Sequence, residues 1–563
     1  MPRKLLAVAL LWLVLVPSAG ARPTPLMPGV AYESIAGRSS AGPLRSYVIT
    51  APKPGGLYSL TPLLSNGTIT GRETVSSMER HVSSQMTTIG VNGDFFNWLG
   101  GWPSGLLMQD GVLQHQSSVN RSSVGIDTSG NLHVDRVSFS AIWKGFSTLA
   151  YPISQLNEPP KGNSAALFTP VWGATTPPVN GVAVVIEPFP ATTPFRDLVG
   201  TVTGVVSTNS VAIPRDGAVL VARGTAADAV RADALVGGQL TIRFTISAGW
   251  SSVTDAVGGG PALVKNGKAI AKSGEDLTNV QLYGHDPRTA IGQRADGGLV
   301  LVAADGRRRG WSAGISNLEL AQALIKRGAV IGFALDSGGS TTVAFDGKVL
   351  NWPSDPSGER PVGEALVIGY AGVYAPAPAP TLSPNGDRFG DRESLTYKIV
   401  RPSTVSAKLV SGDRTERELD TGTKQPGTYR VAWNGTDATG TAAPEGKYRW
   451  SVTATDDLGR TSTAKRTFTV DKTLGFVRVG RNARTVRFTL TRPASIRVTV
   501  ADRYIGTLRT VARGQRPAGP VTARWNGKDG RGKRVAPGSY TVHVTATSTI
   551  GASQVGVPVR IGR

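Results

Sequence analysis

The sequence contains no cysteine and few histidines. Without cysteine there is no structural disulfide, no catalytic thiolate and no thiolate metal site. The histidines show no metal-ligand spacing. They are His81, His115, His133, His285 and His543. We therefore predict no cofactor and no resident metal, although the aspartates discussed below leave hard-cation binding open.

Long apolar runs are also missing after the N-terminus. Arg3 and Lys4 precede an apolar run from Leu5 to Val16, and small residues at 19–21 fit a cleavage site. The run is short for a bilayer span. The pattern predicts a signal peptide at residues 1–21 of a secreted, extracellular bacterial protein without membrane contact after cleavage. An uncleaved membrane anchor is the alternative.

Acidic residues are scarce at the other end of the chain. The chain has a formal net charge of +22, and residues 475–563 contain 17 Lys and Arg against 2 Asp and Glu. Such a segment attracts polyanions through screened electrostatics. For an exported protein we expect cell-wall polyanions or acidic polysaccharides as partners, and no nucleic acid. A generically basic, solvated surface is the alternative.

The length of 563 residues exceeds what one hydrophobic core usually organises. Residues 375–380 alternate alanine with proline, which favours an extended linker over residues 374–380. We therefore predict a large domain over residues 22–373, followed by a separate C-terminal part.

The C-terminal part contains an internal repeat. Trp433-Asn434-Gly435 recurs as Trp525-Asn526-Gly527, and alternating apolar and polar runs follow both copies. Such runs, bounded by Asn-Gly and Asp-Gly turns, predict two β-sandwiches at residues 381–471 and 475–563. Both modules resemble the immunoglobulin-like domains of flagellar hook-capping proteins and of bacterial extracellular enzymes.

The larger N-terminal part shows strand and helix signals in turn. Residues 298–303 and 329–335 are apolar runs typical of buried strands. Between them, Ser316 and Glu319 form a capping box that predicts a helix ending at Gly328. This order predicts a mixed α+β catalytic domain.

Three loops of this domain combine an acid with glycine directly after a strand-like run. They are Asn92-Gly93-Asp94, Asp305-Gly306-Arg307 and Asp336-Ser337-Gly338-Gly339-Ser340. A strand holds the acid rigidly, and glycine lets the backbone approach a ligand closely. Any one of these loops alone is more typical of an ordinary turn.

Six motifs occur together in a fixed order. They are Gly258-Gly259-Gly260-Pro261, Pro287-Arg288-Thr289, Asp305-Gly306-Arg307, Asp336 to Thr342, Asn351-Trp352-Pro353 and Glu359-Arg360-Pro361. This ordered set resembles the phosphodiester glycosidase (uncovering-enzyme) family over roughly residues 90–370. The resemblance implies a hydrolase that releases a sugar, such as N-acetylglucosamine, from a C1-linked phosphodiester.

The residues suit this reaction. We expect the carboxylates of Asp336 and Asp94, and then of Asp305, to stabilise the oxocarbenium ion, attack it or activate water. A phosphate leaving group needs cations. The candidates to bind it are Arg288, Arg307 and Arg360. Polar side chains that could hold sugar hydroxyls or phosphate oxygens are Asn92, Thr289, Ser340 and Asn351.

Two positions depart from the family pattern. Ser337 replaces the second residue of the family's Asp-Gly-Gly-Gly-Ser, and Asp94 stands where the family often has glycine. Our hypothesis is a secreted hydrolase of glycosyl-phosphate or anionic polysaccharides in cell-wall or capsular polymers, held near them by its basic modules. The alternative is a non-catalytic cell-wall or glycan-binding protein that retains the fold.

Overall fold

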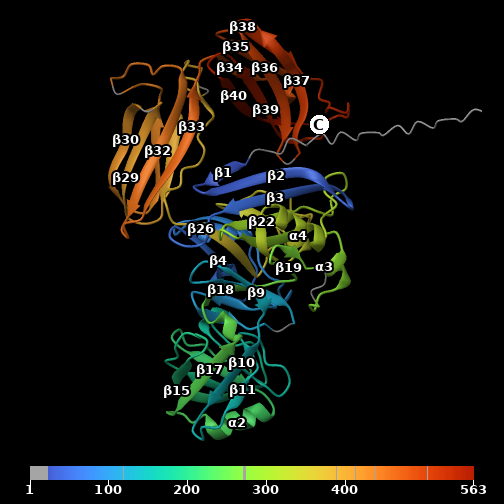
Figure 1. The fold of residues 1–563 in the computed structure, drawn as a ribbon, viewed down its shortest axis with the longest axis vertical. Coiled ribbons are helices and arrows are strands. Elements are labelled where there is room, and N and C mark those ends of the chain that lie inside the picture. The colour runs from blue at the N-terminus through green and yellow to red at the C-terminus, as the bar shows by residue number, and fades with distance from the viewer. Residues whose placement is uncertain are drawn as a thin grey trace, which may run out of the picture.

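The structure is a computed structural model that describes residues 23–117, 120–270, 274–387, 390–412, 414–437, 439–503 and 505–562. The predicted signal peptide lies outside these ranges. Figure 1 shows two β-sandwiches at one end of the molecule, a layered β domain in the middle and an inserted β domain at the other end. Within the described ranges no helix is long and apolar enough to cross a membrane.

One large sheet forms the centre of the middle domain. Its strands, in pairing order, are β1 (Thr24–Met27), β2 (Val30–Ser39), β3 (Gly42–Ala51), β22 (Leu299–Ala304), β21 (Arg288–Arg294), β23 (Ala329–Ala334), β19 (Ala262–Lys265) and β20 (Lys268–Ala269). All of these pairs are antiparallel. Because β21 lies between β22 and β23, the helix that joins β22 to β23 crosses over one strand.

Two smaller sheets cover one face of the large sheet. The first comprises β25 (Lys348–Val349), β24 (Val343–Phe345), β5 (Thr87–Asn92), β26 (Glu364–Tyr370) and β4 (Tyr58–Leu64). The second comprises β7 (Val112–His115), β6 (Leu107–Gln109), β18 (Val253–Gly258), β8 (Ser122–Asp127) and β9 (Leu132–Arg136). Ile89, Leu301, Phe333 and Leu366 pack between the layers in one buried cluster.

The prediction of a mixed α+β domain is wrong. The described residues are mostly strand, and the helices are short. The helices are α1 (Val75–His81), α2 (Thr225–Asp233), α3 (Asn279–Tyr283) and α4 (Asn317–Lys326). The predicted helix does form as α4, and its capping box joins Ser316 and Glu319.

The misleading signal came from strands that are buried on both faces. In β22, Leu301 faces the smaller sheets, while Val300 and Val302 pack in the cluster that includes Leu324 of α4. A strand covered on both faces is an unbroken apolar run, which is typical of parallel sheets in α/β proteins. Here one helix and a second β layer provide the two covers.

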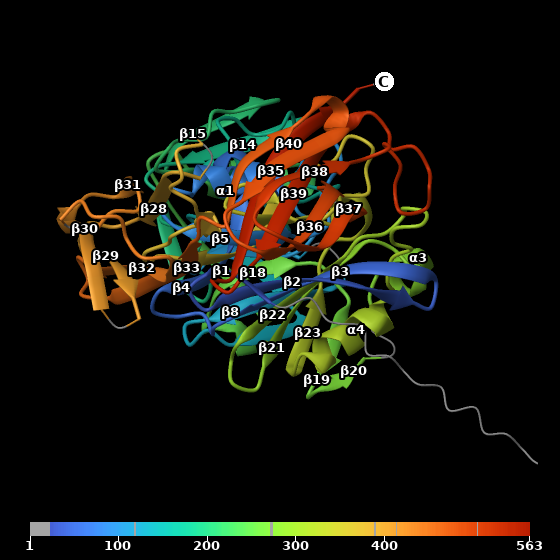
Figure 2. The same ribbon diagram turned by 90° about the horizontal axis from the view of Figure 1, so that it is seen from above.

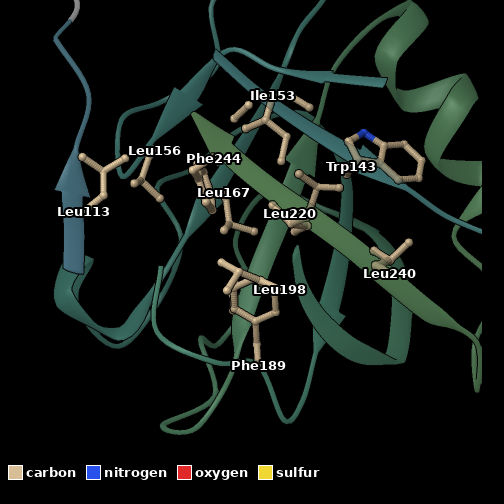
Figure 3. Close-up of a cluster of buried hydrophobic side chains, with 14 of the residues drawn as sticks. Leu113, Trp143, Ile153, Leu156, Leu167, Phe189, Leu198, Leu220, Leu240 and Phe244 are labelled. Atoms are coloured by element: carbon tan, nitrogen blue, oxygen red, sulfur yellow. The ribbon is translucent and has the colours of Figure 1, made fainter. Parts of the chain in front are cut away.

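An inserted domain interrupts the chain between β9 and β18. Its strands, in pairing order, are β11 (Tyr151–Ile153), β10 (Phe139–Lys144), β17 (Gln239–Ile246), β15 (Asp197–Thr208), β14 (Gly181–Ile186), β16 (Ala218–Ala222), β13 (Ala165–Phe168) and β12 (Gln155–Leu156). Figure 3 shows its core, in which Trp143, Leu220 and Phe244 are buried. The sequence analysis did not separate this insertion from the surrounding domain.

The C-terminal modules are two sandwiches. The first pairs β27 (Thr381–Leu382), β33 (Thr461–Val470), β32 (Gly446–Asp456), β29 (Ser403–Ser411) and β30 (Arg414–Lys424), opposite β28 (Glu393–Ile399) and β31 (Gly427–Trp433). The second pairs β34 (Leu474–Val479), β35 (Thr485–Leu490) and β38 (Gly519–Arg524), opposite β37 (Gly506–Arg516), β36 (Ala494–Asp502), β39 (Gly538–Thr547) and β40 (Ala552–Ile561).

The repeated Trp-Asn-Gly motif has the same local structure in both modules. The buried indole of Trp433 donates its N–H to the Thr436 carbonyl at 2.6 Å. The buried indole of Trp525 donates to the Lys528 carbonyl at 2.8 Å. The tryptophan therefore fills the core and satisfies its polar atom in the adjacent turn.

Candidate active site

The candidate site lies at one edge of the middle domain, where strands of two sheets end together. In the large sheet, β22 ends beside the start of β21, because Ala304 pairs with Arg288. In the neighbouring sheet, the last residue of β5, Asn92, pairs with Ala365 near the start of β26. The loops after β5, β22 and β23 therefore start from the same edge.

Hydrogen bonds join the two sheets at this edge. The Asn92 side chain donates its amide N–H to the Asp336 carbonyl at 2.8 Å. The Asp336 N–H donates to the Gly93 carbonyl at 2.9 Å. Thr289 donates its hydroxyl to the Asn92 side-chain oxygen at 2.7 Å. Asn92 and Thr289 thus hold the loops together through buried contacts and are not turned toward solvent.

Three carboxyl groups gather behind these loops. Asp94 and Asp336 were predicted, and Glu364, the first residue of β26, was not. The Asp94 N–H donates to Glu364 Oε1 at 2.7 Å. Exposure is 8% for Asp336, 1% for Asp94 and 0% for Glu364. Asp336 is therefore the member of this carboxyl cluster that is closest to solvent.

The carboxyl cluster shifts the acidity of its members. Burial raises the pKa of Asp336 to about 7, and the negative charge of Asp94 adds to the rise, against hydrogen bonds from Ser340 and Ser337. Burial and then repulsion from Asp94 raise the pKa of Glu364 well above its ordinary value. Burial also raises the pKa of Asp94, which the nearby Arg121 partly offsets.

Asp94 is held by the backbone around it. Its carboxylate accepts hydrogen bonds from the N–H of Phe95 at 2.7 Å and of Gly105 at 2.6 Å. A side chain at Gly258 would collide with this carboxylate. The first glycine of the triple-glycine motif therefore makes room for Asp94 and does not form a phosphate-binding turn.

Asp336 opens the loop that carries Ser337, Gly338 and Gly339. Its carboxylate accepts the Ser340 hydroxyl at 2.5 Å and the Ser337 N–H at 2.7 Å. Ser337 has φ −120°, which any residue adopts, whereas Gly338 has φ +71°. The serine in place of the family's glycine therefore fits this backbone without strain.

Two of the predicted arginines lie against this loop. Arg307 forms a bidentate pair with Asp286 at 2.6 and 2.7 Å, and a Cβ at Gly338 would lie 2.9 Å from its Nη2. Arg360 forms a bidentate pair with Asp355 at 2.8 and 2.9 Å. A side chain at Gly339 would collide with the Arg360 guanidinium. Glycine at both positions lets the two cations approach the Asp336 loop.

An exposed aromatic side chain extends the site beyond Arg360. The Arg360 guanidinium lies 5.1 Å from the ring centre of Trp98, which is 59% exposed. Trp98 was not predicted as a site residue. The signal that could have found it is an aromatic residue in the glycine-rich loop directly after the Asp94 motif.

Arg288 does not face the site. Its buried guanidinium donates to the carbonyls of Ile315 at 2.9 Å, Gly284 at 2.7 Å and Val280 at 3.3 Å. Burial lowers the pKa of this guanidinium to about 10. Arg288 therefore links β21 to the segments before and after it, in place of the predicted phosphate contact.

Asp305 is likewise occupied by structural contacts. It accepts the Tyr47 hydroxyl at 2.7 Å, the Trp311 indole N–H at 2.9 Å and the Trp352 N–H at 3.1 Å. Asn351 donates to the same carboxylate at 3.2 Å and accepts the Val343 N–H. Asp305 and Asn351 thus fix the loops at the edge of the site, and neither is placed to contact a substrate.

Glu364 carried a weak signal in the sequence. It lies four residues after Arg360, directly before the apolar run of β26. An acid at the start of a buried strand is unusual unless it has a partner or a chemical role.

Within the described ranges, no three His, Asp or Glu side chains have the arrangement of a metal site.

Comparison with known proteins shows which family models match this chain. Residues 196–369 match the family model described as phosphodiester glycosidase. Residues 397–457 and 477–549 match the model of the FlgD Ig-like domain. The chain therefore contains a phosphodiester glycosidase domain followed by FlgD Ig-like domains, which confirms the resemblance found in the sequence.

Individual relatives match over shorter segments. The chain is 39% identical over 108 residues to the SPbeta prophage-derived uncharacterized protein YomE of Bacillus subtilis (strain 168), covering 19% of this chain and 16% of that protein. It is 43% identical over 68 residues to the human N-acetylglucosamine-1-phosphodiester alpha-N-acetylglucosaminidase, covering 12% and 13%. The matched segments thus span less than a fifth of either relative.

A solved structure supports the fold. A hypothetical protein from Synechocystis superposes with a TM-score of 0.52 at 23% identity, covering 62% of this chain and 64% of that one. At this identity the likeness concerns the fold alone.

Proposed function

We propose that this protein hydrolyses the glycosidic bond of sugar-1-phosphodiesters, with Asp336 as the reacting carboxylate. The observation that carries the proposal is the position of Asp336. It has the raised pKa of about 7, it is the most exposed of the carboxyl cluster, and the guanidinium groups of Arg307 and Arg360 lie against its loop. A base with a pKa near neutrality suits proton transfer at ambient pH.

The chemistry assigned to these groups is a displacement at the sugar C1. The bond between C1 and the phosphate oxygen breaks, and its electron pair leaves with the phosphate. Water forms the new bond to C1 and gives one proton to the Asp336 carboxylate. The products are the free sugar and a phosphate monoester, whose charge Arg307 and Arg360 stabilise.

The buried neighbours set the state of Asp336. Asp94 lies close enough for its charge to raise the pKa of Asp336, and burial and then Asp94 raise the pKa of Glu364. When two carboxyl groups are buried close together, ionisation of one raises the pKa of the other. Asp94 is therefore a positioning residue whose charge adds to the effect of burial on the pKa of Asp336, and Glu364 holds Asp94 by accepting its backbone N–H.

The substrate class and location follow from the sequence and from one relative. The human relative is an N-acetylglucosamine-1-phosphodiester glycosidase by name. We propose glycosyl-phosphate units of this kind in cell-wall or capsular polymers as the substrate of a secreted enzyme. The predicted signal peptide and the basic C-terminal module support this location.

A non-catalytic glycan-binding protein is the alternative function. Two departures from the family pattern motivate it, at Ser337 and at Asp94. The extended backbone at Ser337 accommodates the serine and leaves the Asp336 contacts in place, so this departure gives the alternative no support. The departure at Asp94 still motivates it.

The test compares the full chain with its Asp336→Asn variant on a soluble sugar-1-phosphodiester. Released sugar is measured, and Asp228→Asn, on the exposed face of α2, is the matched control. We expect Asp336→Asn to lower kcat at least about hundredfold, as removal of a general base typically does. In the wild type, kcat should rise with pH through about pH 7. Equal activity of Asp336→Asn and wild type, or a wild type without activity on a panel of glycosyl phosphates, would refute the proposal.

A further inference from the structure

A pocket of about 680 Å³ lies between the glycosidase domain and the second Ig-like domain. Arg309, Trp311 and Trp352 line it from the glycosidase domain. Thr507, Arg531 and Lys533 are among the residues that line it from the second Ig-like domain. Figures 1 and 2 show the second Ig-like domain beside the middle domain, with β36 and β37 on the side of β2.

The glycosidase wall of the pocket is linked to the candidate active site through Asp305 and Arg307. Trp311 and Trp352 both donate hydrogen bonds to Asp305, at the end of β22. Arg307, two residues after Asp305, lies against Gly338 in the Asp336 loop. The pocket and the reacting carboxylate therefore share one edge of the large sheet.

The lining is suited to phosphate-linked sugars. Arg309, Arg531 and Lys533 supply cations, and the acid beside them, Asp529, already accepts the backbone N–H groups of Arg531 and Lys533 at 2.9 Å each. The indoles of Trp311 and Trp352 meet edge to face at 5.3 Å. Because Arg45 and Arg308 already lie over these two indoles, at 4.5 and 4.2 Å from the ring centres, the lining suits a phosphate-linked sugar through its cations, which pair with phosphate oxygens.

The second Ig-like domain is anchored on this side of the molecule. The Arg503 guanidinium donates to the Val349 carbonyl in β25 at 3.4 Å. The Gln554 N–H donates to the Thr381 hydroxyl of the first Ig-like domain at 3.2 Å. Both contacts lie on the side where the start of β37 and the 529–533 loop face the glycosidase domain.

We propose that this pocket is a second substrate subsite, in which the second Ig-like domain binds a phosphate-linked sugar unit next to the one cleaved at Asp336. The inference rests on the proposed function and specifies its substrate as a polymer that spans both domains. The volume of the pocket falls in the range of sites that hold small organic ligands. The second Ig-like domain is then part of the binding site and not only a basic tether.

The test reverses charges inside the pocket and on a distant face of the same domain. The pocket variant is Arg531→Glu with Lys533→Glu. The control is Arg478→Glu with Arg487→Glu, an exposed cross-strand pair on β34 and β35 with the same change in net charge. For each full-length protein, kcat/KM is measured on a small sugar-1-phosphodiester and on a glycosyl-phosphate polymer at about 0.15 M salt, where general charge effects are screened beyond about 8 Å.

We expect the ratio of polymer to small-substrate kcat/KM to fall at least tenfold in the pocket variant, through a higher KM, and to change less than twofold in the control. Equal losses in both double variants would show that net charge alone attracts the polymer, and would overturn the inference. No loss in the pocket variant would overturn it as well.

A second experiment tests whether a bulky group placed in the pocket blocks binding of the polymer. Because the chain has no cysteine, Thr507→Cys can be labelled alone with a bulky uncharged maleimide, with Thr522→Cys on the exposed face of β38 as the labelled control. Labelling at position 507 should weaken polymer binding at least tenfold in an Asp336→Asn background, and labelling at position 522 should not. Equal binding of both labelled proteins would refute the subsite. Because this readout is binding, it stands even if the wild type releases no sugar, which would refute only the proposed function.

Discussion

The raised pKa of Asp336 makes a prediction about stability that is independent of any substrate. In the folded protein the pKa is about 7, against an ordinary value of 3.8. Between these values the folded state binds more protons than the unfolded state, so the free energy of unfolding falls as the pH rises. Asp336→Asn removes this titration. The stability of the variant relative to the wild type should therefore increase as the pH rises toward 8.

The magnitude follows from the size of the shift. One pKa unit corresponds to about 1.4 kcal/mol, so ionising Asp336 costs the folded wild type about 4 kcal/mol at pH 8. At pH 5 the carboxyl of the folded protein is still protonated. The free energy of unfolding has then fallen by only about 2 kcal/mol, because only the pH range from 3.8 to 5 contributes. The advantage of Asp336→Asn should thus grow by about 2 to 3 kcal/mol from pH 5 to pH 8.

Differential scanning calorimetry of the two proteins at both pH values measures this change. The exchange of carboxyl for amide also alters the contacts with Ser337 and Ser340, but that contribution does not depend on pH and cancels in the comparison. Asp228→Asn, at an exposed position, is the control for the general effect of exchanging a carboxyl for an amide. If the gap between Asp336→Asn and wild type is the same at pH 5 and pH 8, or has the opposite sign, the assigned acidity of Asp336 is wrong.

Three further predictions separate chemistry from scaffold. Arg360→Lys keeps the positive charge but loses the planar guanidinium that can bind phosphate through two hydrogen bonds. The value of kcat/KM on a soluble sugar-1-phosphodiester should therefore fall about 10- to 100-fold at an unchanged Tm. A fall in kcat/KM below twofold would contradict a phosphate contact. Arg288→Ala leaves buried carbonyls unpaired and should lower the free energy of unfolding by about 3 kcal/mol in urea titrations, while kcat of the folded protein stays within about threefold. Trp143→Ala should cost about 3 to 5 kcal/mol and lower the unfolding temperature of the inserted domain in calorimetry; an unshifted profile would contradict its place in that core.

Local sequence signals predict where in the chain the candidate site lies, but they do not predict which side chains form it. Asp94, Asp305 and Asp336 were singled out because an acid beside glycine at the end of a strand run is visible in the sequence. Which acid faces solvent depends on pairing between sheets. The pairing of Asn92 with Ala365 brings Glu364 beside Asp94, although 270 residues separate the two acids.

The fold class failed for a related reason. The capping box at Ser316 and Glu319 is a local signal, and it predicted α4 correctly. The cover on the other face of β22 comes from strands far away in the sequence, such as β5 and β26. An apolar run shows that a strand is buried on both faces, but it does not show whether a helix or a sheet provides the second cover.

The structural roles of Arg288 and Asp305 change what the family motifs imply. Both residues belong to the motifs that carry the resemblance, yet both are saturated with contacts inside the protein. A binding protein that retained the fold would need them as much as an enzyme would. Under the proposed function, catalysis rests on Asp336 with Arg307 and Arg360 beside its loop, and these two arginines also form ion pairs with Asp286 and Asp355. The variants that decide between an enzyme and a binding protein are those at these three positions.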